Sequence, residues 1–149
     1  MRGLKSWLSI TTLGALLVPG LTGCTKFKQL KECNQFIRVV NASKQELDAQ
    51  PRAKNPDVAT VVKETRDLSV RFEKLAAKVT ALDVTAPKLK PHVDKYQAVA
   101  EQAAATLRDV ASAVEKMDAK AAKEKQREFD QAAKTEDQLV EAINAVCHS

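Results

Sequence analysis

Apolar residues recur at intervals of three and four along most of this chain, in four runs separated by short breaks. The clearest run extends from residue 56 to 82 and follows the heptad spacing of helices that pack against one another. Asn55 and Pro56 are suited to the N-cap and first turn of a helix, so we expect a helix over 56–82. The residues on its stripe are Val58, Val61, Thr65, Leu68, Phe72, Leu75, Val79 and Leu82.

Two later runs and a weaker early run have the same spacing. They predict helices over about 27–49, 90–117 and 119–146. The interval lengthens to five residues after Met117, where Asp118 is expected to cap the last helix. The first stripe contains Leu30, Cys33, Ile37, Val40, Lys44 and Leu47; the third runs from Leu89 to Met117 and includes Tyr96; the fourth includes Phe129, Glu136, Leu139 and Ile143.

Four helices of similar length with short connections predict an all-α fold, an antiparallel up-down-up-down four-helix bundle. The alternative is a helical hairpin followed by one long helix or coiled coil over residues 91–146, because no glycine or proline follows Pro91 to force a turn there.

The first residues have the composition of an export signal. Arg2 and Lys5 precede an apolar run from Trp7 to Val18, which is too short and too interrupted to span a membrane. The segment Leu21-Thr22-Gly23-Cys24 resembles the lipobox of bacterial lipoproteins. This resemblance implies cleavage after residue 23 and attachment of acyl chains to the sulfur of Cys24. Ordinary cleavage nearby, with Cys24 left as a thiol, is the alternative.

Cleavage would leave residues 24–149 as a single domain. The signal holds two of the 24 basic residues and no acidic ones, so 22 basic residues would face 19 acidic ones, a net charge of +3. This mild charge does not predict a nucleic-acid partner. All four glycines lie in the signal, and their absence afterwards excludes glycine-dependent phosphate and dinucleotide loops.

Cys33 and Cys147 are the thiols that remain, and exported proteins meet an oxidising compartment. In the bundle, the start of the first helix and the end of the last lie at the same end, so we expect a disulfide. Unpaired thiols or an intermolecular bridge are the alternatives.

A Cys33–Cys147 bridge would set the first and last helices in a register that brings Lys44 level with Glu136. We expect a partly buried ion pair there, with outward extension of both side chains as the equal alternative.

The sequence predicts no catalytic group, metal site or cofactor. Carboxylates are not paired within an apolar stripe, and the two histidines, His92 and His148, have no second ligand at metal-binding spacing. Tyr96 is interpreted as a core residue with its hydroxyl near the surface.

Five lysines are expected to gather at the membrane end of the bundle and to face lipid headgroups. They are Lys26, Lys28, Lys31, Lys88 and Lys90.

These features favour a non-enzymatic lipoprotein of the bacterial cell envelope, anchored in a membrane by lipid and acting as a structural or protein-interaction module with an unidentified protein partner. Thr25, where aspartate signals inner-membrane retention in enteric bacteria, favours the outer membrane. The alternatives are a carrier of a small or haem-like ligand, suggested by Ala100, Ala103 and Ala104, and a homo-oligomeric coiled coil.

Overall fold

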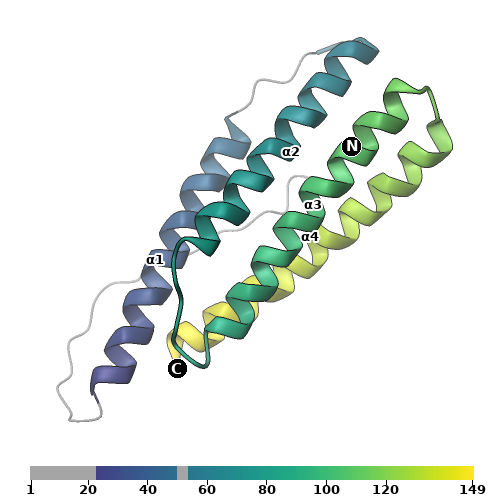
Figure 1. Ribbon diagram of the computed structural model, residues 1–149. Coiled ribbons are helices and arrows are strands. Elements are labelled where there is room, and N and C mark those ends of the chain that lie inside the picture. The colour runs from purple at the N-terminus through teal and green to yellow at the C-terminus, as the bar shows by residue number, and fades with distance from the viewer. Residues whose placement is uncertain (1–22, 50–53) are drawn as a thin grey trace.

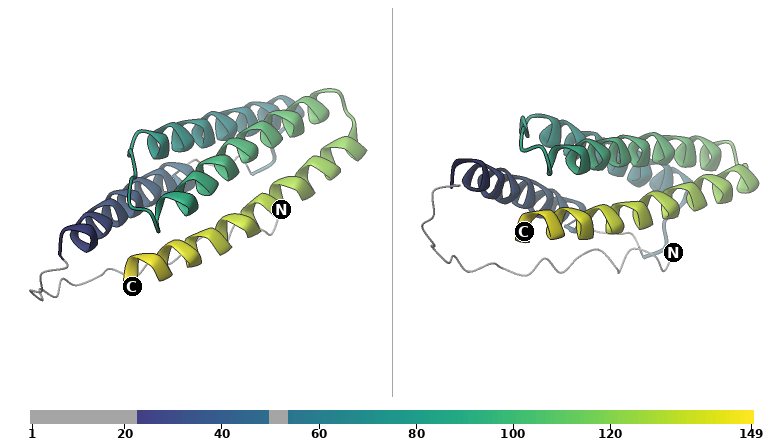
Figure 2. Two further views of the ribbon diagram at one scale, coloured as in Figure 1. Left: turned by 60° about the horizontal axis from the view of Figure 1, so that its bottom comes forward. Right: turned by 90° about the horizontal axis from the view of Figure 1, so that it is seen from below.

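The computed structural model describes residues 23–49 and 54–149, which form four α-helices and no strand. The helices are α1 (Gly23–Asp48), α2 (Val58–Thr80), α3 (Lys90–Glu115) and α4 (Ala119–His148). They run alternately up and down and pack side by side as a bundle (Figures 1 and 2). The predicted bundle is therefore confirmed. The single long helix is wrong, because α3 ends at Glu115 and α4 begins at Ala119.

The core is built from the predicted stripes of α3, α4 and the second half of α2. In the first half of α2 the stripe is wrong, because Val62 and Ser69 are buried and Val58 is exposed. Tyr96, Leu89 and Ile143 are among the most deeply buried large side chains. Small residues on α3, among them Ala100, Ala103 and Ala111, let this helix pack closely against both α2 and α4. The core draws on all four helices, from Cys33 on α1 to Ile143 on α4.

The core-facing side of α1 differs from the prediction. Phe36 and Ser43 are buried where the pattern placed Ile37 and Lys44, and Leu30 is exposed. Cys33 and Val40 of the expected stripe are buried as predicted, so the buried face of α1 is shifted toward Glu32, Phe36 and Ser43. The physical reason for the shift is that Glu32 binds residues 85–86 inside the bundle, which fixes the rotation of the helix.

The start of α2 is also corrected. Its N-cap is Asp57, not Asn55, because a carboxylate oxygen of Asp57 accepts a 2.7 Å hydrogen bond from the Thr60 amide. The N-cap of α4 is Asp118 as predicted, and its side chain accepts a 2.9 Å bond from the Ala121 amide.

In the turn between α3 and α4, Met117 occupies a left-handed backbone position where glycine is usual. Met117 has a φ of 56°, its amide bonds to the Val114 carbonyl at 3.0 Å, and the Asp118 amide bonds to the Ala113 carbonyl at 2.9 Å. This pair of bonds is the Schellman arrangement that ends many helices, usually with glycine at the left-handed position. Met117 is therefore 81% exposed in a turn instead of lying on the core stripe, as the sequence pattern had suggested.

Candidate functional site

One end of the bundle gathers three parts of the chain: the start of α1, the end of α4 and the connection between α2 and α3 (Figure 1). We call this the anchor end, because α1 begins one residue before Cys24, the residue that the sequence predicts to carry a lipid anchor. Residues 1–22, where the sequence predicts an export signal that includes Leu21 and Thr22 of the lipobox resemblance, lie outside the described part of the chain.

A disulfide joins α1 to α4 at the anchor end. Cys33 and Cys147 are bridged with their Cα atoms 5.8 Å apart, across 114 positions of sequence, which confirms the predicted pairing. One turn earlier on α1, the Gln29 side-chain amide donates a 2.7 Å hydrogen bond to the carbonyl of Val146. The covalent bond and the hydrogen bond hold the two ends of the described chain together.

Glu32 secures the α2–α3 connection to the same end. Its carboxylate accepts hydrogen bonds from the Ala86 amide at 2.8 Å, the Thr85 hydroxyl at 2.9 Å and the Thr85 amide at 3.1 Å. Burial alone would raise the pKa of Glu32, but these bonds and the charge of Lys28 outweigh it and hold the pKa below its usual value. The sequence analysis did not assign this role to Glu32. Nothing in the sequence around Glu32 indicates that its side chain binds the distant residues 85–86.

The five lysines predicted for the anchor end are all exposed. Lys26, Lys28 and Lys31 lie on the first turns of α1, while Lys88 and Lys90 lie on the α2–α3 connection and at the start of α3. The bonds from Glu32 to Thr85 and Ala86 bring these two segments to the same end of the molecule. Lys90 also binds Asp94 at 2.8 Å, one helical turn along α3.

Two apolar side chains project from the same stretch of α1. Phe27 is 73% exposed and Leu30 is 47% exposed. Positions three apart lie on the same side of a helix, so these two residues form one apolar pair between the lysines. The expected stripe placed Leu30 in the core, which is wrong, and the sequence pattern did not single out Phe27 as an exposed apolar residue.

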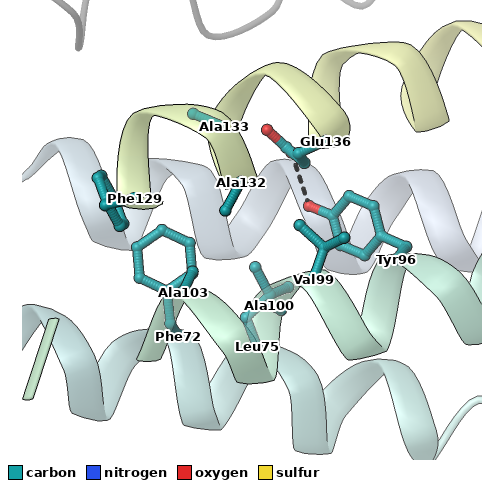
Figure 3. Close-up of a pocket in the computed structure, with 10 residues that line it drawn as sticks. All are labelled: Phe72, Leu75, Tyr96, Val99, Ala100, Ala103, Phe129, Ala132, Ala133 and Glu136. Carbon is teal, nitrogen blue, oxygen red and sulfur yellow. Dashed lines mark hydrogen bonds between the residues drawn. The ribbon is translucent and has the colours of Figure 1, made fainter. Parts of the chain in front are cut away.

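A buried polar pair lies in the middle of the bundle. The Tyr96 hydroxyl donates a 2.9 Å hydrogen bond to Oε1 of Glu136, and both residues are almost fully buried (Figure 3). The hydroxyl therefore lies inside the core, contrary to the expectation that it reaches the surface. Oε2 of Glu136 has no hydrogen-bond partner.

Burial dominates the acid strength of this pair. Burial raises the pKa of Glu136, and the negative charge of Asp137 raises it further. The hydrogen bond from Tyr96 and the positive charge of Lys44 lower it, and the resulting pKa is about 7. Burial and the neighbouring carboxylate raise the pKa of Tyr96, so its hydroxyl keeps its proton. Lys44 thus acts on Glu136 through its charge, whereas the hydrogen bond comes from Tyr96; the expected ion pair between Lys44 and Glu136 stays a prediction.

Beside this pair is a small cavity between α2, α3 and α4 (Figure 3). Phe72 and Phe129 form one wall with their rings edge to face and 5.8 Å apart. Of the three alanines that the sequence suggested for a cavity, Ala100 and Ala103 line it and Ala104 does not. Its volume of about 10 Å³ holds about one water molecule.

Comparison of the chain with protein-family models, curated proteins and solved structures finds no match. Within residues 23–49 and 54–149, no helix is long and apolar enough to cross a bilayer. In those same residues, no three histidine, cysteine or acidic side chains converge in a way that would hold a metal ion.

Proposed function

We propose that this protein is a bacterial envelope lipoprotein, anchored through acyl chains on Cys24, whose helical bundle acts as a non-enzymatic structural or protein-interaction module. The observation that carries the proposal is the position of Cys24 in the first turn of α1. A lipid there would join the bundle to the membrane with no linker between them, and the disulfide would hold the end of α4 at the same surface.

The buried polar groups of the bundle support a structural role. The Glu32 carboxylate is engaged by the backbone and hydroxyl of residues 85–86, and the Glu136 carboxylate by Tyr96. Both contacts fix one segment of the protein against another, as polar groups do when they specify how helices pack.

The end opposite the anchor is the part that would face a protein partner. Met117 and Val58, which are 81% and 47% exposed, lie there at the α3–α4 turn and at the start of α2 (Figure 1). Exposed charges of both signs accompany them, including Lys116, Asp118 and Lys120. Methionine is enriched and lysine and aspartate are depleted at protein interfaces, so Met117 is the side chain there that best suits a protein partner, with the charges as its rim.

The two alternatives predict different features. A carrier of a haem-like ligand needs its helices to separate, since the cavity beside Glu136 has room for about one water molecule. A homo-oligomeric coiled coil needs free apolar faces, whereas Phe72, Leu107 and Leu139 on the heptad stripes are buried within this chain. The lipoprotein module therefore has the better support.

The proposal is tested by growing bacteria that express the full chain with an alkyne-bearing fatty acid. We expect the label on the wild-type protein, found in the membrane fraction, and no label on Cys24→Ser. Cys24→Ser is expected to persist as the longer, uncleaved chain, because the lipoprotein peptidase acts after lipidation. Equal labelling of both proteins, or an unlabelled wild type in the soluble fraction, contradicts the proposal. Separation of inner and outer membranes then tests the preference for the outer membrane.

A further inference from the structure

The first two turns of α1 expose apolar side chains in a position that the bundle does not use. Phe27, at 73% exposed, is more accessible than either Val58 or Val70 on α2, at 47% and 45%. Burial of apolar surface away from water is favourable by about 25 cal/mol for each Å², and an aromatic ring exposed at the end of a domain does not obtain this free energy. Phe27 and Leu30 would recover this free energy in an apolar environment outside the protein.

Their position along α1 indicates what that environment is. A helix rises 1.5 Å per residue, so Phe27 and Leu30 lie about 4.5 and 9 Å along the axis from Cys24. Amphipathic segments bury their apolar side chains about 5–10 Å into the boundary between headgroups and acyl chains. With the sulfur of Cys24 acylated, as the proposed function requires, both side chains are within reach of this boundary.

The charges at the anchor end favour an anionic surface. Five lysines face solvent there, and the same segments of α1, of the α2–α3 connection and of the start of α3 carry the carboxylates Glu32, Asp83 and Asp94. Glu32 is turned inward to Thr85 and Ala86, and Asp94 is occupied by Lys90. The four other lysines at this end then face one exposed carboxylate, Asp83, so the outward charge is positive. Each lysine near an anionic bilayer contributes up to about 1 kcal/mol.

We propose that the anchor end is a membrane-contact surface, in which Phe27 and Leu30 insert among the headgroups of an anionic bilayer and the surrounding lysines bind lipid phosphates. This inference rests on the proposed lipid anchor and adds to it. The bundle is held against the bilayer by its own side chains, and the opposite end is presented at a fixed height of about one helix length, roughly 45 Å for the 30 residues of α4.

The test uses residues 24–149 with Cys24→Ser, which retains every described helix except the first residue of α1 and has no lipid of its own. The sequence has a single tryptophan, Trp7 in the signal, so Phe27→Trp gives a single-tryptophan reporter. Met117→Trp is the matched control, since Met117 is 81% exposed at the opposite end. With vesicles of phosphatidylglycerol and phosphatidylcholine, we expect a blue shift and quenching by brominated lipid for Phe27→Trp alone.

Charge is tested with two triple substitutions. Lys26→Glu, Lys28→Glu and Lys31→Glu together are expected to weaken vesicle binding at least tenfold. The same change at Lys116, Lys120 and Lys123, near the α3–α4 turn, is expected to alter it less than twofold. Circular dichroism of each variant verifies the helical fold.

Three results overturn the inference: a Phe27→Trp spectrum unchanged by anionic vesicles, equal shifts for both reporters, or equal losses from both lysine triplets. Because these proteins carry no acyl chain, such a failure leaves the fatty-acid labelling of Cys24 in cells unaffected. The failure of the proposed function and the failure of this inference are therefore distinguishable.

Discussion

The Tyr96 hydroxyl on α3 donates a 2.9 Å hydrogen bond to Oε1 of Glu136 on α4, and the other carboxylate oxygen has no hydrogen-bond partner. A carboxylate with one of its oxygens unpaired in a core is more stable with its proton bound. This explains why the pKa of Glu136 is raised to about 7. The bundle therefore holds a group that changes charge close to neutral pH, at the contact between two helices.

The Glu136→Gln substitution is expected to remove the fall in the free energy of unfolding that the wild-type protein shows as pH rises through 7. Because the folded pKa of about 7 lies above the ordinary value of 4.5, the stability from Glu136 is complete below pH 4.5 and is lost as pH rises through 7. The glutamine keeps an oxygen for Tyr96 and carries no charge. Above pH 8 the variant should be more stable than wild type, by up to about 3 kcal/mol, and near pH 4 nearly equal.

Urea unfolding at pH 4, 6 and 8 measures this difference. Asp130→Asn is the matched control, because Asp130 is an exposed carboxylate on the same helix. A Glu136→Gln advantage that does not change with pH, or that grows in acid, would contradict the assignment of a raised pKa.

The contribution of Glu32 to folding stability is expected to depend on pH in the opposite direction. Its folded pKa is lowered, so the stability that it contributes is present above the ordinary value of 4.5 and is lost as pH falls through the folded pKa. Glu32→Ala leaves the Ala86 and Thr85 donors without their acceptor and should cost about 1–3 kcal/mol at pH 7. Amide hydrogen exchange should accelerate at residues 84–89 in this variant before it does in the middle of α3. Unchanged exchange in that connection would show that Glu32 does not secure it.

Removal of the Cys33–Cys147 bond is expected to lower the free energy of unfolding substantially. It closes a loop of 114 positions, for which the chain-entropy model gives about 4–5 kcal/mol. Urea unfolding of the Cys33→Ser and Cys147→Ser double variant, compared with the oxidised protein, measures this contribution. A loss below about 1 kcal/mol would mean that the hydrogen bond from Gln29 and the core alone hold the two helix ends.

Met117→Gly is expected to stabilise the protein. Met117 adopts a φ of 56°, which costs a residue with a Cβ roughly 1 kcal/mol and glycine much less. The exposed side chain contributes little packing in return. Met117→Ala is the control, since it removes the same side chain but keeps the Cβ. If thermal unfolding shows alanine and glycine to be equally stabilising, the backbone explanation is wrong.

Much of the fold could be predicted because the helical pattern is strong where the core is deepest. On α3 and α4, Tyr96, Leu107, Phe129 and Ile143 are buried as their spacing implied. The disulfide was predictable from topology, since alternating helices bring the first and last to one end.

The predictions failed where a contact between distant segments decides the structure. The rotation of α1 depends on Glu32 binding residues 85–86, and no local pattern encodes that contact. The burial of the Tyr96 hydroxyl depends on a partner 40 residues away, Glu136. The register that placed Lys44 level with Glu136 gave no signal of the hydrogen bond from Tyr96.

Intact-mass spectrometry of the full-length gene product, purified from bacterial membranes without reductant, tests the central claim most directly. We predict one dominant species, in which the chain begins at Cys24 and carries acyl chains, with two hydrogens fewer than the same species after reduction. That mass would place a lipid and the Cys33–Cys147 bond at the same end of the bundle. A chain that begins elsewhere, carries no lipid or keeps two free thiols would contradict the account.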